Sequence, residues 1–432
     1  MAPEWRNWAG DQACRPAAIE HPTSAAEVAG AIGRARTAGR TVRAAGAGHS
    51  FTDAALTNGA LLVLDRMRRV LDVDRGSGLA RVEAGISLSE LSEALWAHGL
   101  AFENLGDIDV QSIAGATATG THGTGSRLRN LSAGLREIEL VTADGSTIRV
   151  SEDDDADAWR AARVSVGSLG VVTAVTLQAV PAFTLEGVDS TAPLDDVLGR
   201  ADELADSAEH FEFYVFPHSS LALTRTNRRA DRSPQPPSRA RAWIDDVLLR
   251  NYVFGIACGA GRRAPRLIPQ INRLLARASG TTRRVDRSYR VFASPRLVRF
   301  TEMEYALPRA RAAEAARAVL DVAQRPGFAV PFPIEVRFVA PDDAFLSPAG
   351  GRETAYIAVH MYRGMEWEPY FRAVEQVMDG FDGRPHWGKR HFQTAATLAP
   401  RYPEWDRFQA VRRRLDPDGV FANGYVRRVL AG

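Results

Sequence analysis

The chain has 432 residues, 45% of them hydrophobic, and a formal net charge of +2. This length predicts two or three domains, and this hydrophobic content is sufficient for ordinary buried cores. No apolar run approaches the ~18 residues of a membrane helix, and the N-terminal residues lack the basic and apolar regions of a secretory signal. We therefore expect a cytoplasmic protein without a membrane span, although peripheral association with a membrane stays possible.

Cysteine usage indicates the redox compartment and argues against a metal site. Cys14 and Cys258 are the only cysteines, and the chain has no Cys-x-x-Cys pair and no histidine cluster at metal-ligand spacing. This pattern predicts a reducing compartment and no metal.

Basic residues are unevenly distributed and are almost all arginine. Residues 221–290 contain 16 Arg, 4 Asp and no Glu. Such a stretch indicates either a solvated arginine-rich surface or a site for an anionic partner. It lacks the regular aromatic interleaving of a nucleic-acid surface, which favours the solvated surface and no nucleic acid. Lys389 is the single lysine among 54 basic residues, which suggests a position that needs a compact ammonium group.

The first part of the chain alternates short strands with capped helices, but without regular βαβ repetition. Residues 22–39 have the pattern of a helix capped at Thr23 or Ser24, and residues 87–98 that of a second helix. Strands are expected at residues 41–45, 61–64, 70–74, 79–84 and 169–180, with a hairpin of 135–142 and 146–150 around Asp144-Gly145.

The strand at residues 41–45 leads into Gly46-Ala47-Gly48-His49-Ser50-Phe51. Two glycines let backbone N–H groups approach a pyrophosphate closely, and His49 follows where the rings of a cofactor could begin. The third glycine of the dinucleotide fingerprint is missing. The alternative is a tight glycine turn beside a buried histidine.

Residues 104–125 form a second glycine-rich stretch, which includes Ala114-Gly-Ala-Thr-Ala-Thr-Gly-Thr-His-Gly-Thr-Gly125. Its small residues allow close approach to a ligand, and Ser112, Thr117, Thr119 and Thr121 supply hydroxyl groups. We expect a long loop without regular structure that forms a second wall of a cofactor site.

After residue 183 the pattern predicts a second α+β domain. We expect helices at residues 194–208, 310–324, 368–378 and 405–415, a helical pair within 244–278, and a mobile Pro- and Arg-rich loop at 228–241. Strands are expected at residues 211–216, 298–307, 334–339 and 354–362. Together they predict an antiparallel sheet covered by helices.

Two strands of this sheet carry candidate functional residues. Glu335 and Arg337 are two residues apart, so both side chains project from one face of their strand. They could bind neighbouring oxygens of a sugar, or they could form an ordinary cross-strand salt bridge. His360 lies among apolar residues, where a histidine is more often a core residue than a catalyst.

Taken together and in order, five motifs resemble those of sugar-lactone oxidoreductases, flavoproteins of the vanillyl-alcohol-oxidase type. They are the Gly-x-Gly-His-Ser turn, the wall at residues 114–125, the Glu335-x-Arg337 pair, Leu346-Ser-Pro-Ala-x-Gly-Arg352 and His386-Trp-Gly-Lys389. The family includes gulonolactone, arabinonolactone and galactonolactone oxidases or dehydrogenases and alditol oxidases. The resemblance covers nearly the whole chain.

The resemblance implies an α+β fold with a two-part FAD-binding domain at residues 10–181. A cap domain at residues 182–383 would cover the flavin, and residues 384–432 would return to the FAD domain. It also implies that FAD is held by Gly46, Ala47, Gly48, His49, Ser50, Phe51, Gly106, Asp107, Ser112, Gly115, Thr119, Gly120, Thr121, His122 and Val172. His49 matches the histidine that is bonded to the flavin 8-methyl carbon in many members.

The implied reaction transfers a hydride from a carbinol carbon to the flavin. Lys389 matches the family residue that stabilises the charge developing near flavin N1. Arg337 would stabilise the alkoxide, Glu335 would accept a hydrogen bond or the proton, and His360 would face the substrate.

Several alternatives stay open. Alditol oxidases carry serine at the position of Asp107, which favours a 1,4-lactone of the gulonolactone or arabinonolactone type over an alditol. Gly106 lacks the methyl group found in members that react poorly with oxygen, which favours O2 over another acceptor. Outside enzymology, a flavin-binding protein without turnover or a basic docking module would explain part of the pattern.

Overall fold

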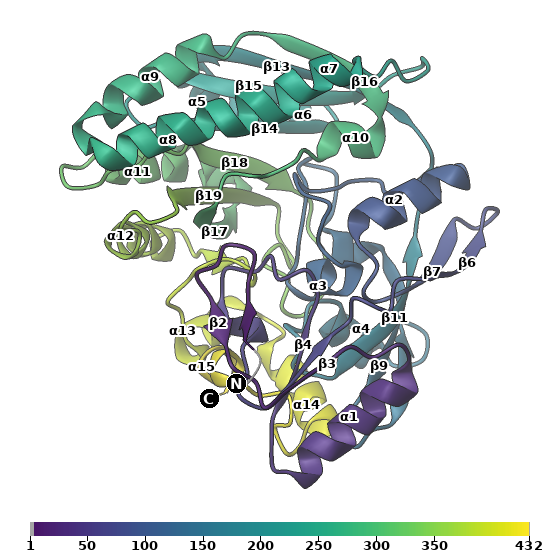
Figure 1. The fold of residues 1–432 in the computed structure, drawn as a ribbon. Helices are drawn as coiled ribbons and strands as arrows, with labels where there is room; N and C mark the ends of the chain where they lie inside the picture. The colour runs from purple at the N-terminus through teal and green to yellow at the C-terminus, as the bar shows by residue number, and fades with distance from the viewer. Residues whose placement is uncertain (1–3, 432) are drawn as a thin grey trace.

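Two halves, one above the other in Figure 1, make up residues 4–431, which the computed structural model describes. The lower half contains a three-stranded parallel sheet in the order β3-β5-β4 and a five-stranded antiparallel sheet in the order β10-β9-β11-β7-β6. The upper half is built on one eight-stranded antiparallel sheet in the order β16-β13-β15-β14-β18-β19-β17-β20. The predicted α+β class, with an antiparallel sheet covered by helices, is confirmed.

The elements of the lower half are β1 (Trp5–Arg6), β2 (Ala13–Cys14), β3 (Ala18–Glu20), α1 (Ala25–Thr37), β4 (Val42–Ala45), η1 (Asp53–Ala55), β5 (Ala60–Val63), β6 (Val70–Asp74), β7 (Leu79–Glu83), α2 (Leu88–Ala97), β8 (Leu100–Ala101), α3 (Ile113–Ala118), η2 (Leu131–Gly134), β9 (Leu135–Val141), β10 (Thr147–Ser151), α4 (Ala156–Arg163), β11 (Val171–Gln178) and β12 (Val180–Pro181). Ser24 caps α1 and Ser87 caps α2 with a capping box, so both predicted helices are confirmed.

The elements of the upper half are β13 (Thr184–Pro193), α5 (Leu194–Gly199), α6 (Ala201–Asp206), β14 (His210–Val215), β15 (Leu221–Arg229), α7 (Arg239–Ala242), η3 (Trp243–Val253), α8 (Phe254–Arg263), η4 (Pro265–Leu267), α9 (Ile268–Ala278), β16 (Thr282–Arg287), α10 (Ser288–Phe292), β17 (Phe300–Pro308), η5 (Arg309–Arg311), α11 (Ala312–Ala323), β18 (Ile334–Val339), β19 (Thr354–Tyr362), α12 (Glu368–Asp379) and β20 (Arg384–Pro385).

The chain then returns to the lower half through α13 (Ala395–Leu398), η6 (Ala399–Arg401), α14 (Trp405–Leu415) and α15 (Gly424–Leu430). Figure 1 shows these yellow helices beside the purple N-terminal strands. Asn423 donates to the carbonyl oxygens of Asp53, Ala54 and Leu56 at 2.8–3.1 Å. The domain boundaries at residues 181 and 383 stay predictions.

One face of the eight-stranded sheet is apolar and the other carries charged side chains. In β18, Ile334, Val336 and Phe338 join the apolar core under α5, α6, α11 and α12, whereas Glu335 and Arg337 point to the other face. Since side chains alternate along a strand, the same separation extends to β14, β17 and β19. The polar face is the one that meets the lower half.

Three sequence expectations about secondary structure were wrong. Residues 104–125 were expected to lack regular structure but contain α3, which Ser112 caps. The single helix predicted at 194–208 is two helices, α5 and α6, that meet at Arg200 after Gly199. Glycine is a poor interior helix residue, which accounts for the break. Arg228 and Arg229, placed in a mobile loop, belong to β15.

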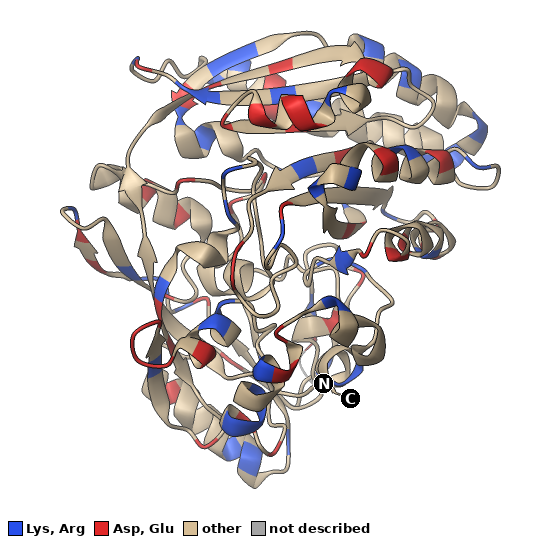
Figure 2. Cartoon of the chain, turned by 180° about the vertical axis from the view of Figure 1, so that it is seen from behind, with Lys and Arg blue, Asp and Glu red and all other residues tan. Residues whose placement is uncertain are grey.

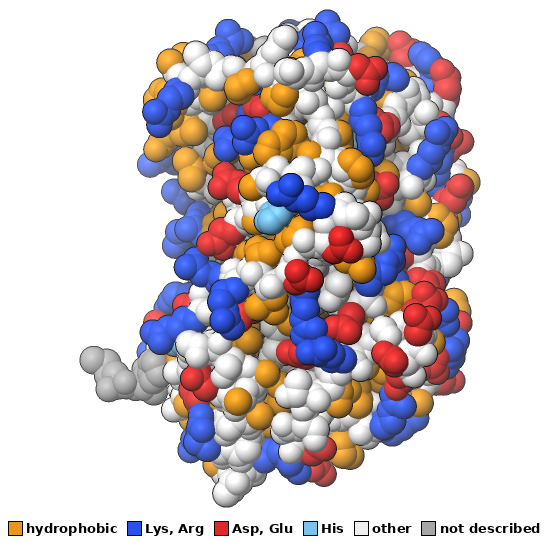
Figure 3. Space-filling view, turned by 90° about the vertical axis from the view of Figure 1, so that its right-hand side faces the viewer, with side chains coloured by type: hydrophobic (Ala, Val, Ile, Leu, Met, Phe, Trp, Pro, Cys, Tyr) orange, Lys and Arg blue, Asp and Glu red, His pale blue; other side chains and the backbone are white. Residues whose placement is uncertain are grey.

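Charged side chains are mixed over much of the surface. Figure 2 shows basic and acidic residues interleaved along the strands and helices, and Figure 3 shows both signs scattered among apolar patches on one side. Within the arginine-rich stretch, Arg229, Arg241 and Arg283 pair with Glu209, Asp245 and Glu186. Part of this stretch is therefore an ion-paired surface.

Candidate active site

The first of two adjoining cavities lies beside the glycine turn after β4 and holds about 960 Å³ of empty space. An added Cβ at Gly46 would lie 1.9 Å from Ser112 Oγ, and Gly48 has a φ of 69°, a region that favours glycine. Glycine at these positions therefore lets the turn pack closely against its neighbours, and the cavity beside the turn forms a trough. Predicted residues that line it are Gly46, Ala47, Gly48, His49, Ser50, Ser112, Gly115, Thr119 and Val172.

The second cavity lies between the two halves and holds about 810 Å³ of empty space, part of which is open to solvent. His49, Ser50, Gln111 and Thr119 line both cavities, so the two adjoin. Predicted residues that line the second cavity are His49, Ser50, Phe51, Gly106, Asp107, Thr119, Thr121, His122, Glu335, Arg337, His360 and Lys389. Gly120 lines neither cavity.

Strand pairing brings the catalytic candidates together on the polar face. Arg337 lies opposite Glu212 of β14, and Ala358 of β19 lies opposite both Glu335 and Glu304. His360 lies opposite Glu302 of β17. Directly opposed residues share a face, so one row of ionisable groups crosses the middle of the sheet.

Arg337 is the cation at the centre of three carboxyl groups, of which Glu335 and Glu212 are buried and Asp107 is half-buried. Its Nη2 lies 2.5 Å from Asp107 Oδ1 and also contacts Glu335, while its Nε donates to Glu212 at 2.9 Å. Asp107 in turn accepts a hydrogen bond of 2.8 Å from Arg296. Arg337 and Glu335 are only 8% and 7% exposed, so these charges interact with little screening by water.

The pKa values of Glu335 and Asp107 are shifted in opposite directions. Burial raises its pKa well above the ordinary value, the positive charge of Arg337 opposes this, and the negative charges of Asp107 and Glu212 add to it. Arg337 and Arg296 hold the pKa of Asp107 below its usual range despite burial. The arrangement therefore favours a neutral Glu335, whose Oε1 is the atom that contacts Arg337.

Lys389 contacts a buried acid, Glu302, that the sequence interpretation missed. The ammonium group pairs with Glu302 Oε2 and lies 5.2 Å from the ring centre of Phe51. His360 Nε2 lies 3.5 Å from the other oxygen of Glu302. Burial opposes ionisation of Glu302, but Lys389 and His360 lower its pKa to about 2, so its carboxylate pairs with the Lys389 ammonium group and faces the His360 imidazole.

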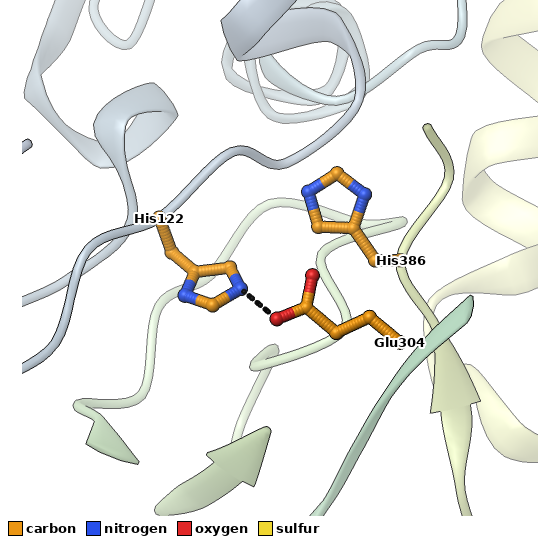
Figure 4. A group of neighbouring side chains, drawn as sticks. All are labelled: His122, Glu304 and His386. Atoms are coloured by element: carbon orange, nitrogen blue, oxygen red, sulfur yellow. Dashed lines mark ion pairs between the residues drawn. The ribbon is translucent and has the colours of Figure 1, made fainter. Parts of the chain in front are cut away.

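A second buried acid, Glu304, lies between two histidines (Figure 4). His122 Nε2 is 3.2 Å from Glu304 Oε1, and His122 Nδ1 is 2.8 Å from the carbonyl oxygen of Gly123. Because a carbonyl oxygen can only accept, His122 Nδ1 carries the hydrogen of its bond to Gly123, and Nε2 faces the carboxyl group of Glu304. Burial lowers the pKa of His386 to about 3, and its Nδ1 accepts a hydrogen bond from the backbone N–H of Gly388.

His49 lines both cavities and is held as a neutral imidazole. Its ring stacks on Trp8 with 5.0 Å between ring centres. Burial is the main cause that lowers its pKa to about 4, and the charges of Lys389 and Arg299 add to this effect. A neutral ring nitrogen is nucleophilic at neutral pH, as attachment to a cofactor requires.

The residues present fit FAD. The two adjoining cavities suit an elongated dinucleotide, and the trough at Gly46 and Gly48 suits its pyrophosphate. Gln111 lines both cavities, and its buried Oε1 has no hydrogen-bond partner among residues 4–431. Such an unpaired acceptor needs a polar ligand atom to satisfy it.

The second cavity also contains residues that sequence reasoning did not select as site residues. Glu302 and Glu304 carried a usable signal, since two acids alternate with apolar residues along a buried strand, as Glu335 and Arg337 do with Val336. The others lie in loops or at element ends without a periodic pattern. They are Trp8, Ile108, Gln111, Arg296, Phe300, His386 and Gly388.

Two known protein families match this chain, one mainly in the lower half and the other mainly in the upper half and the C-terminal segment. The FAD binding domain family matches residues 16–151, and the D-arabinono-1,4-lactone oxidase family matches residues 175–429. A solved structure of cholesterol oxidase from Brevibacterium sterolicum has a TM-score of 0.80 and 19% identity, over 99% of this chain and 96% of that one. This likeness supports the predicted fold of a two-part FAD domain with a cap.

Two relatives match over nearly their full length. L-gulono-1,4-lactone dehydrogenase of Mycobacterium tuberculosis is 53% identical, with 100% of both chains covered. L-gulonolactone oxidase of Mus musculus is 34% identical, over 99% of this chain and 98% of the relative. The sequence-based resemblance and the prediction of FAD are thereby confirmed. The chain belongs to the D-arabinono-1,4-lactone oxidase family and is an FAD-dependent oxidoreductase that acts on CH–OH groups.

Proposed function

We propose that this protein oxidises a secondary ring hydroxyl of an aldono-1,4-lactone, of the L-gulono-1,4-lactone or D-arabinono-1,4-lactone type. The observation that carries the proposal is the convergence of Glu335, Arg337, His360 and Lys389 on one cavity that adjoins the trough at Gly46. The names of the two relatives support this substrate class. Bound FAD supplies the hydride acceptor.

Arg337 would bind the oxygen of the reacting hydroxyl, and Glu335 would bind the carbonyl oxygen of the lactone. Arg337 stabilises the developing alkoxide of the reacting hydroxyl, because its charge lies in a water-poor site. Neutral Glu335 carries a proton, so it donates a hydrogen bond to the lactone carbonyl instead of removing a proton. This refines the sequence-based role of Glu335 as an acceptor.

His360 is then the group that takes the hydroxyl proton. Its Nδ1 is buried without a hydrogen-bond partner among residues 4–431, and its Nε2 faces Glu302 at 3.5 Å. A carboxylate behind an imidazole stabilises the imidazolium that forms. Lys389 supplies a fixed positive charge on the wall of the same cavity. This charge would favour hydride transfer from the substrate to bound FAD.

Steady-state turnover on a panel of lactones and alditols tests the substrate class. We expect faster turnover of a 1,4-lactone than of an alditol, because Asp107 and Arg337 form a charged wall suited to the lactone. Faster turnover of alditols would support the alternative, an alditol oxidase that releases H2O2. We infer O2 as the acceptor, because Gly106 lines the cavity and carries no methyl group. Turnover that requires an artificial acceptor would contradict this inference.

Covalent attachment of FAD through His49 predicts a simple spectroscopic result. After acid precipitation, the yellow colour should stay with the polypeptide, and His49→Ala should release it. The attachment reaction should proceed at neutral pH and fail as the pH falls below about 4, because His49 becomes protonated there. Colour released from the unaltered protein would contradict the proposal.

Replacement of Glu335 distinguishes a hydrogen-bond donor from a base. Glu335→Gln keeps a neutral donor, so we expect kcat/KM for the lactone to fall by less than about tenfold, whereas Glu335→Ala should cost roughly a hundredfold. Stopped-flow measurement of both variants at several pH values provides the check. A Gln variant as slow as the Ala variant would instead indicate proton transfer to Glu335.

Residues 4–431 contain no helix long and apolar enough to cross a membrane. We propose a cytoplasmic location, because both cysteines are free and a reducing compartment maintains free thiols.

A further inference from the structure

The helical hairpin of residues 239–278 carries arginines that the rest of the protein does not neutralise. Residues 254–281 include five Arg and no Asp or Glu. Among residues 4–431, no acidic group forms an ion pair with any of the five, whereas Arg225, Arg250 and Arg284 pair with buried or half-buried acids. The five are Arg262, Arg263, Arg266, Arg273 and Arg277.

The same hairpin exposes a stripe of apolar side chains. Leu249, Tyr252, Val253 and Ile256 are 50%, 55%, 42% and 73% exposed. Their spacing of three, one and three residues places them on one face of the helix. Leu267, at the end of η4, and Leu274, in α9, are 45% and 67% exposed.

The inner side of the hairpin is packed separately. Cys258, Ile268 and Ala276 are buried, and Asn272 donates to the carbonyl oxygens of Pro217 and Val330. The outer stripe is therefore not needed to attach the hairpin to the sheet. Figure 1 shows α7, α8 and α9 at the top of the molecule, far from both termini.

The chemistry of this face selects one kind of partner. Scattered apolar residues on a surface are ordinary, but a continuous apolar stripe beside unpaired cations indicates a binding surface. A symmetric contact with a second copy would bring the five arginines against the same five arginines. An anionic lipid surface offers phosphates to the arginines and an apolar layer to the stripe.

We propose that the outer face of residues 243–278 docks on a membrane surface that contains anionic phospholipid. Trp243, which is 52% exposed, and Tyr252 have the amphipathic rings that favour the headgroup region. This inference stands independently of the substrate proposed above.

The inner side of the docking helix is joined to the rim of the active-site cavity by Asn251, which is buried. Asn251 Nδ2 donates to the carbonyl oxygen of Pro295 at 3.0 Å, and its Oδ1 accepts from Leu297 N–H at 2.7 Å. Arg296, between these two residues, lines the cavity and bonds to Asp107. Two hydrogen bonds therefore connect the helix that carries the docking face to the rim of the cavity.

Co-sedimentation of the holoprotein with vesicles tests the proposal. We expect binding to vesicles of phosphatidylcholine with phosphatidylglycerol, weaker binding at high salt, and little binding to phosphatidylcholine alone. The triple variant Arg266→Gln/Arg273→Gln/Arg277→Gln should lose about 100-fold in affinity for the anionic vesicles. Ile256→Ser/Leu274→Ser should also weaken binding, and both variants should keep the turnover rate measured without vesicles.

A matched control changes three exposed arginines of the lower half, as Arg40→Gln/Arg66→Gln/Arg75→Gln. This variant has the same net charge as the hairpin variant and should bind vesicles nearly as well as the unaltered protein. Equal losses in the two triple variants would overturn the proposal, as would a holoprotein that ignores anionic vesicles. A dimer in sedimentation equilibrium that Ile256→Ser/Leu274→Ser dissociates would instead assign the face to a second copy.

Discussion

Arg337→Met should lower kcat/KM for the lactone by about 10³-fold, the largest loss we expect from one side chain. The variant removes the cation proposed to stabilise the alkoxide. It also leaves Asp107 and Glu212 with less compensation in a buried site. Arg337→Lys should recover part of the activity, because it restores the charge but not the planar guanidinium. Stopped-flow kinetics on variants with full FAD content provide the measurement.

Arg225→Met is the control for loss of stability. Arg225 lies one strand beyond Glu212 in the same row, contacts Glu212 and Asp189, and does not line the cavity. Breaking the buried network of Arg337 should lower the free energy of unfolding by roughly 3–5 kcal/mol, and breaking the half-buried network of Arg225 should lower it by less. If Arg225→Met reduced turnover as much as Arg337→Met, the loss would reflect a damaged ion-pair network and not a direct role of Arg337.

Lys389→Met should slow reduction of the bound flavin by about 100-fold. The substitution also leaves Glu302 buried without its main cation, which destabilises the fold. The double variant Lys389→Met/Glu302→Gln removes this unpaired charge, so it should regain stability while staying slow. A double variant with normal reduction rate would contradict the electrostatic role of Lys389 and reduce it to a partner of Glu302.

The ion pair of Lys389 and Glu302 makes the stability of the folded protein depend on pH. Lys389 and His360 lower the pKa of Glu302 to about 2, below its ordinary value of 4.5. A lowered carboxyl pKa stabilises the folded state above pH 4.5, and this contribution is lost as the pH falls toward 2. Acid unfolding of Lys389→Met should therefore show a weaker dependence on pH in this window.

Sequence patterns predicted most of the helices and strands in which the pattern of apolar and polar residues matches the way the element packs. The strands at residues 334–339 and 354–362 and the helix at 405–415 have the predicted bounds. By contrast, β13 and β15 were not recognised, because their polar faces carry the ion pair of Asp189 and Arg225 in place of solvent-facing residues. A strand with charges on a buried face lacks the usual alternation of apolar and polar residues.

The candidate site could be predicted only in part, because its residues come from strands that are distant in the sequence. Residue spacing placed Glu335 and Arg337 on one face, but only strand order brings Glu302, Glu304 and His360 beside them. The protonation of Glu335 depends on Asp107 and Glu212, which lie 228 and 123 residues away in the chain. No local pattern contains this information, because the pKa is set by groups that meet only in the folded protein.

Anaerobic mixing of the purified holoprotein with L-gulono-1,4-lactone, D-arabinono-1,4-lactone and an alditol tests the central claim most directly. The absorbance of the oxidised flavin reports hydride transfer without any assumption about the electron acceptor. We predict rapid bleaching by at least one of the lactones and slower bleaching by the alditol. Bleaching by the alditol alone, or by none of the three, would contradict the proposed lactone oxidation.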